Sequence, residues 1–514
     1  MGGRDRRRRL RRGRRPRGFP RARVGGSVTA MQPRLDLLTS DLVQRVLDEA
    51  FVLLRDHGVK VQAPEALTLL RDAGARADDD VAFLSEDLVR TALETVPREF
   101  HLHDRAGEPT VTYGGDAVQF DPGSSGVHVL DPETLEHRPS RTQDLVRLVK
   151  VAEMLPELDA QSTAIVCDEI PKEIGDLWRL YAVLMHSSRP IVTGAFSITT
   201  LQHMIDMLAV FAGGREALAR KPQAVFDVCP SPPLIWSSFG AQNLIELARA
   251  GVPAEMVSMP LAGAAAPVTL LGSIVQHAAE CLSGIAIHQL AKPGSPIVWG
   301  GAPAIFDMRK GTTPMGAIET AMIDASYAQV GKSLGLPTHT YLGASDAKIV
   351  DAQAGMESGI TAVIGALAGI NMISGAGMLD FLACQSPEKL VVDAEAIAMA
   401  KRLLAGVQPR TETLALELFE GIAFKGEFLK QRATKDLFGL EQHVPSKVID
   451  RDSTRGWLQS GGLDTWARAK ERTAALLEAY ERPSLDPALE AELRGLVEAI
   501  AKDAGIDALP EVVV

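Results

Sequence analysis

The stretch Thr338-His-Thr-Tyr-Leu-Gly-Ala-Ser-Asp-Ala-Lys-Ile-Val-Asp-Ala-Gln-Ala-Gly-Met-Glu357 changes character twice. It begins as a β-favouring run, Thr338 to Leu342, breaks at Gly343, and enters a helix near Asp351. A strand that leads into a polar loop and then a helix start is typical of α/β folds, which concentrate their chemistry in such loops. We therefore expect a functional site here.

The polar side chains of this stretch are spaced to meet. Gln353 and Glu357 are four residues apart and share one helix face. Asp346 and Asp351 place carboxylates near the helix start, where free backbone N–H groups favour negative charge. We predict Asp346, Gln353 and Glu357 as catalytic residues. The alternative is that Asp351 only caps the helix while the other side chains are solvated.

Working outward, short apolar runs alternate with helical patterns from about residue 116. The predicted strands are 117–120, 161–166, 190–192, 224–228, 254–258, 296–299, 338–342 and 370–373. The predicted helices between and after them are 141–155, 172–187, 199–213, 239–250, 268–291, 316–334, 352–367 and 387–405. Strands that read as continuous apolar runs indicate a parallel sheet covered by helices.

Eight strand–helix units predict an α/β fold of the (β/α)₈ TIM barrel type over residues 116–405. A doubly wound open sheet is the alternative, but it leads us to expect a GxGxxG turn after the first strand, which the sequence lacks. Helical patterns at 37–58, 63–74 and 85–96, followed by an alternating strand near 100–105, predict an N-terminal helical cap over 31–115. Charged helical sequence over 406–514 predicts a C-terminal helical extension.

Composition and charge exclude several classes of function. The four cysteines are far apart with no CxxC pair, which argues against a disulfide framework or a cysteine-rich zinc site. We expect no apolar run long enough to cross a bilayer, and hence a cytoplasmic protein without a membrane partner. Of the net charge of −11, residues 1–30 contribute twelve arginines and one aspartate, so the rest carries −22. Such an acidic body does not suit nucleic acid.

The basic segment 1–30 has almost nothing to bury, so we expect a disordered tail. A basic arm that binds RNA or a membrane is one reading. We favour a start at Met31, with the preceding segment outside the natural chain. No apolar region follows the arginines as a twin-arginine signal would need.

The string Gly343-Ala-Ser-Asp-Ala-Lys-Ile-Val-Asp-Ala-Gln-Ala-Gly-Met-Glu357 resembles the strand–loop–helix signature of the trimethylamine methyltransferase family. The resemblance extends from about Leu37 to Leu477 and is densest between Gly300 and Gly377. It implies transfer of a methyl group from an amine to the cobalt of a separate corrinoid protein. Ile349 aligns with the pyrrolysine of the best-known members, which implies the non-pyrrolysine branch and betaine-like quaternary amines.

Residues at the predicted barrel mouth supply candidates for binding such a cation. Aromatic faces attract quaternary ammonium groups, carboxylates add negative field, and Arg309 or Lys348 could pair a substrate carboxylate. The predicted substrate-binding residues are Phe120, Asp121, Trp299, Phe306, Tyr341, Lys348 and Ile349. Aromatic residues that only fill the barrel, Trp236 among them, are the structural alternative.

The glycines that follow four predicted strands favour an open mouth. They are Gly194, Gly300-Gly301, Gly343 and Gly375-Gly377.

His277 and Cys281 have a spacing that could chelate zinc, but their mid-helix position favours core packing. We also interpret His339 as structural and predict no tightly bound metal. A homo-oligomer is a further expectation. The alternative functions are a methylated-amine-binding barrel without turnover and a carboxylate-dependent lyase or decarboxylase.

Overall fold

The computed structural model describes residues 32–422, 424, 426–506, 509–510 and 512. It divides into two compact units, and the larger contains Pro33–Leu404 with His443–Val514. Residues Ala405–Gln442 belong to the smaller one. The predicted extension over 406–514 therefore contains residues of both units. The predicted disorder of segment 1–30 lies outside the described residues.

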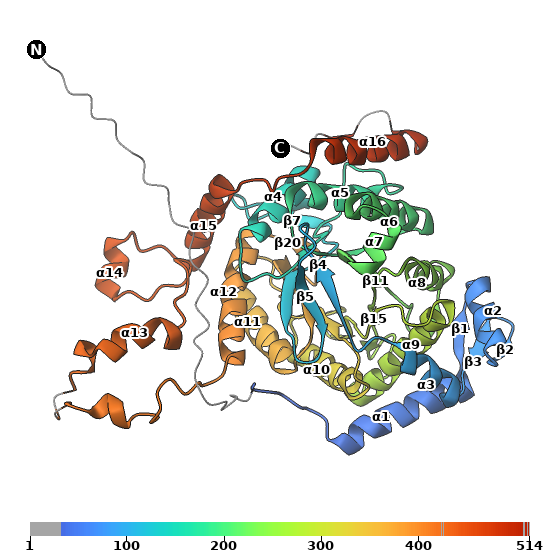
Figure 1. The fold of residues 1–514 in the computed structure, drawn as a ribbon, viewed down its shortest axis with the longest axis horizontal. Coiled ribbons are helices and arrows are strands. Elements are labelled where there is room, and N and C mark those ends of the chain that lie inside the picture. The colour runs from blue at the N-terminus through green and yellow to red at the C-terminus, as the bar shows by residue number, and fades with distance from the viewer. Residues whose placement is uncertain (1–31, 423, 425, 507–508, 511, 513–514) are drawn as a thin grey trace, which may run out of the picture. The chain divides into compact units, whose positions relative to one another are not determined.

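A parallel barrel forms the centre of the larger unit, and helices surround it (Figure 1). Its strands within the described chain are β6 (Gln119–Pro122), β9 (Gln161–Ser162), β10 (Ile191–Gly194), β11 (Ala224–Val228), β13 (Ala254–Met256), β15 (Ile297–Val298), β17 (His339–Thr340) and β18 (Met372–Ala376). Two parallel sheets, β15-β13-β11-β10-β9 and β17-β18-β6, make up the wall. A bridge between Trp299 and Thr338 joins them on one side. On the other side Asp159 N donates to Phe120 O at 2.8 Å.

Each barrel strand is followed by a helix close to its predicted position. These helices are α4 (Thr142–Glu153), α5 (Gly175–His186), α6 (Ile198–Ala212) with α7 (Arg215–Arg220), α8 (Ser238–Ala250), α9 (Leu270–Ala291), α10 (Ile318–Ser333), α11 (Ala352–Leu367) and α12 (Pro387–Leu404). The predicted (β/α)₈ barrel is thus confirmed. Small sheets lie among the loops: β7 (His128–Leu130), β8 (His137–Pro139), β19 (Met378–Leu379) and β20 (Cys384–Gln385) in one, β14 (Leu261–Ala262) and β16 (Ala304–Ile305) in another.

The segment before the barrel is a mixture of helices and strands. Its predicted helices are α1 (Ser40–Val52) with the π-helical turn Leu53–His57, α2 (Pro64–Asp72) and α3 (Glu86–Thr95). Short strands missed by the sequence reading, β1 (Val59–Val61), β2 (Arg76–Asp78) and β3 (Val81–Phe83), form a sheet with β12 (Ile235–Trp236). The hairpin of β4 (Glu99–His103) and β5 (Pro109–Gly114) is the part that shapes the barrel interior.

This hairpin closes the N-terminal end of the barrel (Figure 1). His103 N donates to Pro222 O, and Arg105 N donates to Ser188 O, just before β11 and β10 begin. One buried apolar cluster joins hairpin and strands: Leu102, Val111, Tyr113, Ala160, Val192, Val225, Val298 and Met372. The interior is therefore apolar at its base, and any polar site must lie nearer the C-terminal ends of the strands.

Beyond the barrel, the smaller unit contains the 3₁₀ turns Leu416–Phe419 and Phe428–Lys430 and α13 (Arg432–Glu441). The larger unit ends with α14 (Thr454–Gln459), α15 (Thr465–Ala479), which packs on α12 and α4, and α16 (Pro487–Asp503), which packs on α5 and α6.

The prediction that no apolar stretch reaches bilayer length is wrong for α9, which is long and apolar enough. Its most apolar window is 78% buried inside the protein, as in a core helix of a globular fold.

Candidate active site

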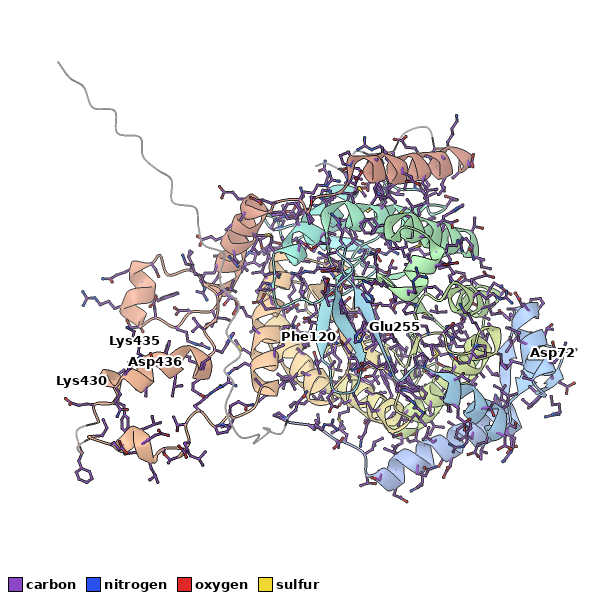
Figure 2. All side chains as sticks on the ribbon, in the orientation of Figure 1. Asp72, Phe120, Glu255, Lys430, Lys435 and Asp436 are labelled. Atoms are coloured by element: carbon purple, nitrogen blue, oxygen red, sulfur yellow. The ribbon has the colours of Figure 1, made fainter. Side chains whose placement is uncertain are left out.

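Three carboxyl groups face the interior just above the apolar base: Asp121 on β6, Asp227 on β11 and Glu255 on β13. Asp121 and Glu255 are fully buried and Asp227 is half-buried. Asp227 and Glu255 are register partners on adjacent strands, so their side chains leave the sheet on the same face. Figure 2 shows Glu255 within the ring of helices. These groups form what we call the acidic centre.

Side chains from β5, β18 and the segment directly after β17 surround the acidic centre. Tyr113 OH, from the hairpin, donates to Glu255 Oε2 at 2.9 Å. Tyr341 OH donates to Asp227 Oδ2 at 2.8 Å. Ser374 Oγ donates to Asp121 Oδ1 at 2.5 Å. The acidic centre is therefore held from opposite sides of the barrel.

His339 links two of the carboxyl groups. Its Nε2 lies 3.0 Å from Ser374 Oγ and 3.2 Å from Glu255 Oε1. Because the Ser374 hydroxyl hydrogen points to Asp121, Nε2 must carry the imidazole hydrogen. Burial lowers the pKa of His339 to about 3, so the ring is neutral near pH 7 and adds no positive charge.

The acidic centre has acceptor capacity that the described chain does not use. Asp121 Oδ2 and Asp227 Oδ1 are buried atoms without a hydrogen-bond partner there, whereas Glu255 Oε1 lies 3.2 Å from His339 Nε2. Burial raises the pKa of Asp227 to about 6 and the pKa values of Asp121 and Glu255 well above their ordinary range. A cation among them would reverse this effect, because an adjacent positive charge favours the ionised form.

The side of the acidic centre toward the C-terminal ends of the strands differs from its base. Cys229, two residues beyond Asp227, is exposed, yet desolvation by the surrounding protein raises the pKa of its thiol to about 12. An apolar cluster just beyond the strand ends, which we call the rim, contains Val257, Ala304, Met315 and Tyr341, with Leu261, Ala302 and Leu382 packed against them. An apolar collar above buried carboxyl groups suits a cation that carries methyl groups.

The three predicted catalytic residues do come together, in a loop cluster. Gln353 Nε2 donates to Glu357 Oε1 at 2.9 Å. Glu357 Oε2 accepts from Ser345 Oγ at 2.6 Å and from Asp346 N at 2.8 Å. Asp346 accepts from Met315 N at 2.8 Å and from Gly316 N at 3.1 Å. Their carboxylates thus fix the loops after β16 and β17, and Met315, whose N–H donates to Asp346, connects this cluster to the apolar residues at the strand ends.

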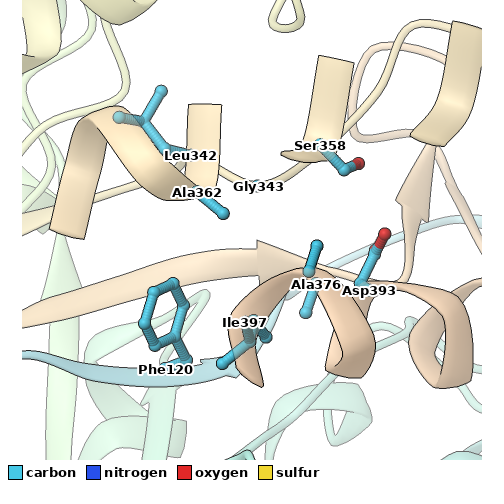
Figure 3. Close-up of a pocket in the computed structure, with 9 residues that line it drawn as sticks. Phe120, Leu342, Gly343, Ser358, Ala362, Ala376, Asp393 and Ile397 are labelled. Carbon is cyan, nitrogen blue, oxygen red and sulfur yellow. The ribbon is translucent and has the colours of Figure 1, made fainter. Parts of the chain in front are cut away.

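Two of the predicted aromatic residues face away from the interior, so their place in a cation cage is wrong. Phe120 alternates with Asp121 and points between the sheet and α11 and α12, where it lines a small pocket with Leu342 and Ile397 (Figure 3). Trp299 is fully buried and donates from Nε1 to Tyr327 O of α10. Trp236 likewise donates to Ser283 of α9. Of the aromatic candidates, Tyr341 contacts the acidic centre.

The remaining predicted binding residues are in the loops. Lys348 donates to Asp346 O at 2.6 Å and pairs with Asp380 at 3.2 Å. Arg309 pairs with Asp307 at 2.8 Å and is exposed. Ile349 is exposed, and Phe306 is half-buried on the loop after β16. Neither cation is free to bind a substrate carboxylate without giving up its partner.

The expected open mouth of glycines is wrong for several positions. A Cβ at Gly300 would come within 2.5 Å of Met256 O, and one at Gly375 within 2.2 Å of Leu342 O. A Cβ at Gly301 would meet His277 at 2.7 Å. These glycines allow close packing of the protein itself. Gly194, beside Asp227, lacks such a clash.

Sequence reasoning missed Glu255 and Tyr113, interpreted His339 as structural and assigned no role to Asp227. The available signal was Ala254-Glu-Met256, a single acidic residue inside a run that reads as a buried strand. An ionisable residue at such a position is unusual unless it has a task. His277 and Cys281 pack in the core as predicted, with Sγ 3.8 Å from Nε2. Among the described residues, no group of three His, Cys, Asp or Glu side chains is arranged to hold a metal ion.

An (β/α)₈ barrel with a buried acidic centre under an apolar rim is thus the class that fold and site define. The family model described as trimethylamine methyltransferase matches residues 2–505, and the chain belongs to that family. The trimethylamine methyltransferase of Desulfitobacterium hafniense is 30% identical over 88% of this chain and 92% of its own length. The glycine betaine methyltransferase of the same species is 28% identical over 92% and 98%.

A solved structure supports the fold. The crystal structure of the Methanosarcina barkeri monomethylamine methyltransferase superposes with a TM-score of 0.52 at 11% identity, covering 85% of this chain and 88% of that one. At this identity the likeness concerns the barrel architecture alone.

Proposed function

We propose that the protein removes a methyl group from a quaternary ammonium compound bound over the acidic centre and passes it to the Co(I) of a corrinoid on a separate protein. Membership of the family makes the chain a methyltransferase that acts on methylated amines. The observation that supports a quaternary substrate is the pair of unpartnered carboxyl oxygens on Asp121 and Asp227, beside Glu255 and beneath an apolar rim.

The chemistry explains why a quaternary amine suits this site. The C–N bond breaks with its electron pair kept by nitrogen, so a cationic nitrogen leaves as a neutral amine. The methyl carbon accepts its new pair from the incoming nucleophile, and no proton moves. His339 is neutral near pH 7, and it sits where a second positive charge would compete with the substrate. The residues therefore need only position the cation and exclude water.

One group of side chains attracts the substrate cation, and another group orients its methyl groups. The acidic centre attracts the cation through charge. Tyr341 lies between the acidic centre and the rim, so its ring contacts methyl groups while its hydroxyl holds Asp227. The rim residues Val257 and Met315 surround the methyl group that points outward. When bound, the corrinoid would supply a strong two-electron nucleophile at this rim. The four cysteines are free thiols, and we place the reaction in the cytoplasm.

The test uses the purified full-length protein with cob(I)alamin and a panel of methylated amines. We expect loss of cob(I)alamin absorbance together with release of the demethylated amine for quaternary substrates only. Glu255→Gln should reduce the rate at least tenfold, while Asp72→Asn, an equivalent change at an exposed position on the periphery (Figure 2), should leave it unchanged.

Other outcomes identify the alternatives. Calorimetric binding of quaternary amines without transfer would indicate a binding protein. Consumption of substrate without cob(I)alamin, in a reaction sensitive to Asp227→Asn, would indicate a lyase, which the raised pKa of Asp227 also suits. Either result overturns the proposal.

A further inference from the structure

The turn between β19 and β20 has a backbone conformation that its residues rarely adopt. Asp380, Phe381 and Leu382 have φ values of 50°, 58° and 67°, so three consecutive side chains other than glycine lie in the left-handed region. This region is uncommon for residues with a Cβ and strongly disfavoured for bulky ones. A turn that only reverses the chain would use glycine or asparagine here. Such strain persists where the surrounding structure holds it, and it concentrates at functional sites.

Contacts with two other segments hold the turn. Asp380 N donates to Ala347 O at 3.0 Å, and Asp380 Oδ1 pairs with Lys348 Nζ at 3.2 Å. The ammonium of Lys348 also lies 3.8 Å from the centre of the Phe381 ring, which adds a cation–π contact. From β8, His137 Nδ1 lies 3.6 Å from Asp380 Oδ2, and His137 Nε2 donates to Lys348 O at 2.7 Å. The loop after β17 and strand β8 thus fix the turn.

The fixed turn places Leu382 against the rim. Leu382 packs on the cluster that contains Val257, Met315 and Tyr341, and Tyr341 donates to Asp227 of the acidic centre. These three members of the rim are buried, whereas Leu382 is half-buried. Leu382 therefore forms an outer layer of the rim, and the strained backbone leaves its side chain little freedom to move aside.

We propose that Leu382 is a specificity-determining residue for the methyl transfer, because its side chain limits the size of the groups carried by the ammonium nitrogen. The inference rests on the proposed function, in which the cation lies over Asp227 and its methyl groups contact the rim. Groups larger than methyl meet a leucine that can withdraw only if the turn is released. Lys348, Asp380 and Phe381 are positioning residues that act through the turn. The sequence suggested Lys348 as a substrate-binding residue instead.

The test compares two cations of equal charge and different size. Tetramethylammonium and tetraethylammonium are titrated into the purified full-length protein by calorimetry, and the ratio of their dissociation constants measures selectivity. We expect the wild-type protein to bind tetramethylammonium at least about tenfold more tightly. Leu382→Ala should reduce this preference about tenfold, since it removes the side chain that the ethyl groups meet. Leu403→Ala, a matched change at an exposed position in the last turn of α12, should leave it unchanged.

Leu382→Gly serves the same test if Leu382→Ala folds poorly. Glycine adopts a φ of 67° without strain, so this variant should unfold at a higher temperature than Leu382→Ala and lose the preference at least as fully. Lys348→Met should reduce the preference about threefold by loosening the turn, while Lys348→Arg, which keeps the charge, should retain it. A purely structural role would weaken the binding of both cations alike and leave their ratio unchanged.

Three results would overturn the role of Leu382 while leaving the proposed function intact. One is a wild-type protein that binds both cations equally well. Another is a ratio within about twofold of the wild-type value in both Leu382 variants. The third is a lower unfolding temperature for Leu382→Gly than for Leu382→Ala, which would contradict the strain that holds the side chain. If the wild-type protein binds neither cation and transfers a methyl group from no quaternary amine, the proposed function itself fails.

Discussion

The acidic centre and the loop cluster contain similar residues and use them differently. In the loop cluster, Asp346 and Glu357 accept hydrogen bonds from backbone and side-chain donors of the same chain. In the acidic centre, Asp121 and Asp227 each retain a buried oxygen that has no partner among the described residues. A satisfied carboxylate holds a loop in place, whereas an unsatisfied buried one has acceptor capacity for a ligand. Whether the carboxyl oxygens already accept hydrogen bonds therefore distinguishes the two sites better than the types of residue they contain.

The largest effect we expect comes from matched amide substitutions in the two sites. Asp227→Asn removes the charge beside the bound nitrogen and should weaken binding of a quaternary amine on the order of 100-fold, as expected for a partly buried ion pair. Asp346→Asn should weaken it less than about threefold and lower the free energy of unfolding by about 1–2 kcal/mol, since one backbone donor loses its acceptor. Calorimetric titration and urea unfolding measure the two quantities.

The reverse pattern would exchange the roles of the two sites. If Asp346→Asn abolished binding and Asp227→Asn affected only stability, the loop cluster would be the cation site that the sequence suggested. Asp72→Asn controls for the loss of one negative charge from the whole protein.

The second prediction concerns pH. Binding of a quaternary amine, whose charge is fixed, should strengthen as the pH rises through about 6, because Asp227 ionises there. Below that value affinity should fall about tenfold per pH unit. The titratable and charged groups near Asp227 include Glu255, Asp121, Tyr113, Tyr341, Cys229 and Arg179. Titrations between pH 5 and 8 should show this midpoint, and Asp227→Asn should abolish it. A binding curve that is flat across this range contradicts an ionising carboxyl group.

Without ligand, the pKa shifts of Asp227 and His339 change the stability of the protein in opposite directions as the pH rises. The folded-state pKa of Asp227 lies above its unfolded value, so its contribution lowers stability as the pH rises from about 4 to about 6. The folded-state pKa of His339, about 3, lies below its ordinary value, so its contribution is lost as the pH falls below about 6.5. Asp227→Asn should remove only the first slope from unfolding measured against pH.

The sequence predicted the barrel well because its signals are local. Apolar runs and helical periods mark each strand–helix unit, and the ends of the predicted strands identified Asp121 and Tyr341 as positions near the mouth. The direction of a side chain depends on the phase of its strand, and a shift of one residue moves it to the other face. This explains why Trp299 and Phe120 were assigned to the interior although they contact the helices. The pairing of Gln353 with Glu357 followed from helix geometry. The structural role of the neighbouring Asp346 could not be predicted, because its donors, Met315 N and Gly316 N, are distant in the sequence.

The smallest expected effects distinguish two aromatic residues that the sequence placed together. Tyr341→Phe removes the hydroxyl that donates to Asp227 and should weaken quaternary amine binding about twofold to tenfold. It should also raise the pH midpoint of binding, because that hydrogen bond favours the ionised carboxylate. Trp299→Phe removes the bond to Tyr327 O and should lower the free energy of unfolding by about 1–2 kcal/mol with affinity unchanged. A selective loss of affinity in Trp299→Phe, with stability retained, would restore Trp299 to the cation site, because a ring that only fills the layer between sheet and helices has no reason to distinguish a bound cation.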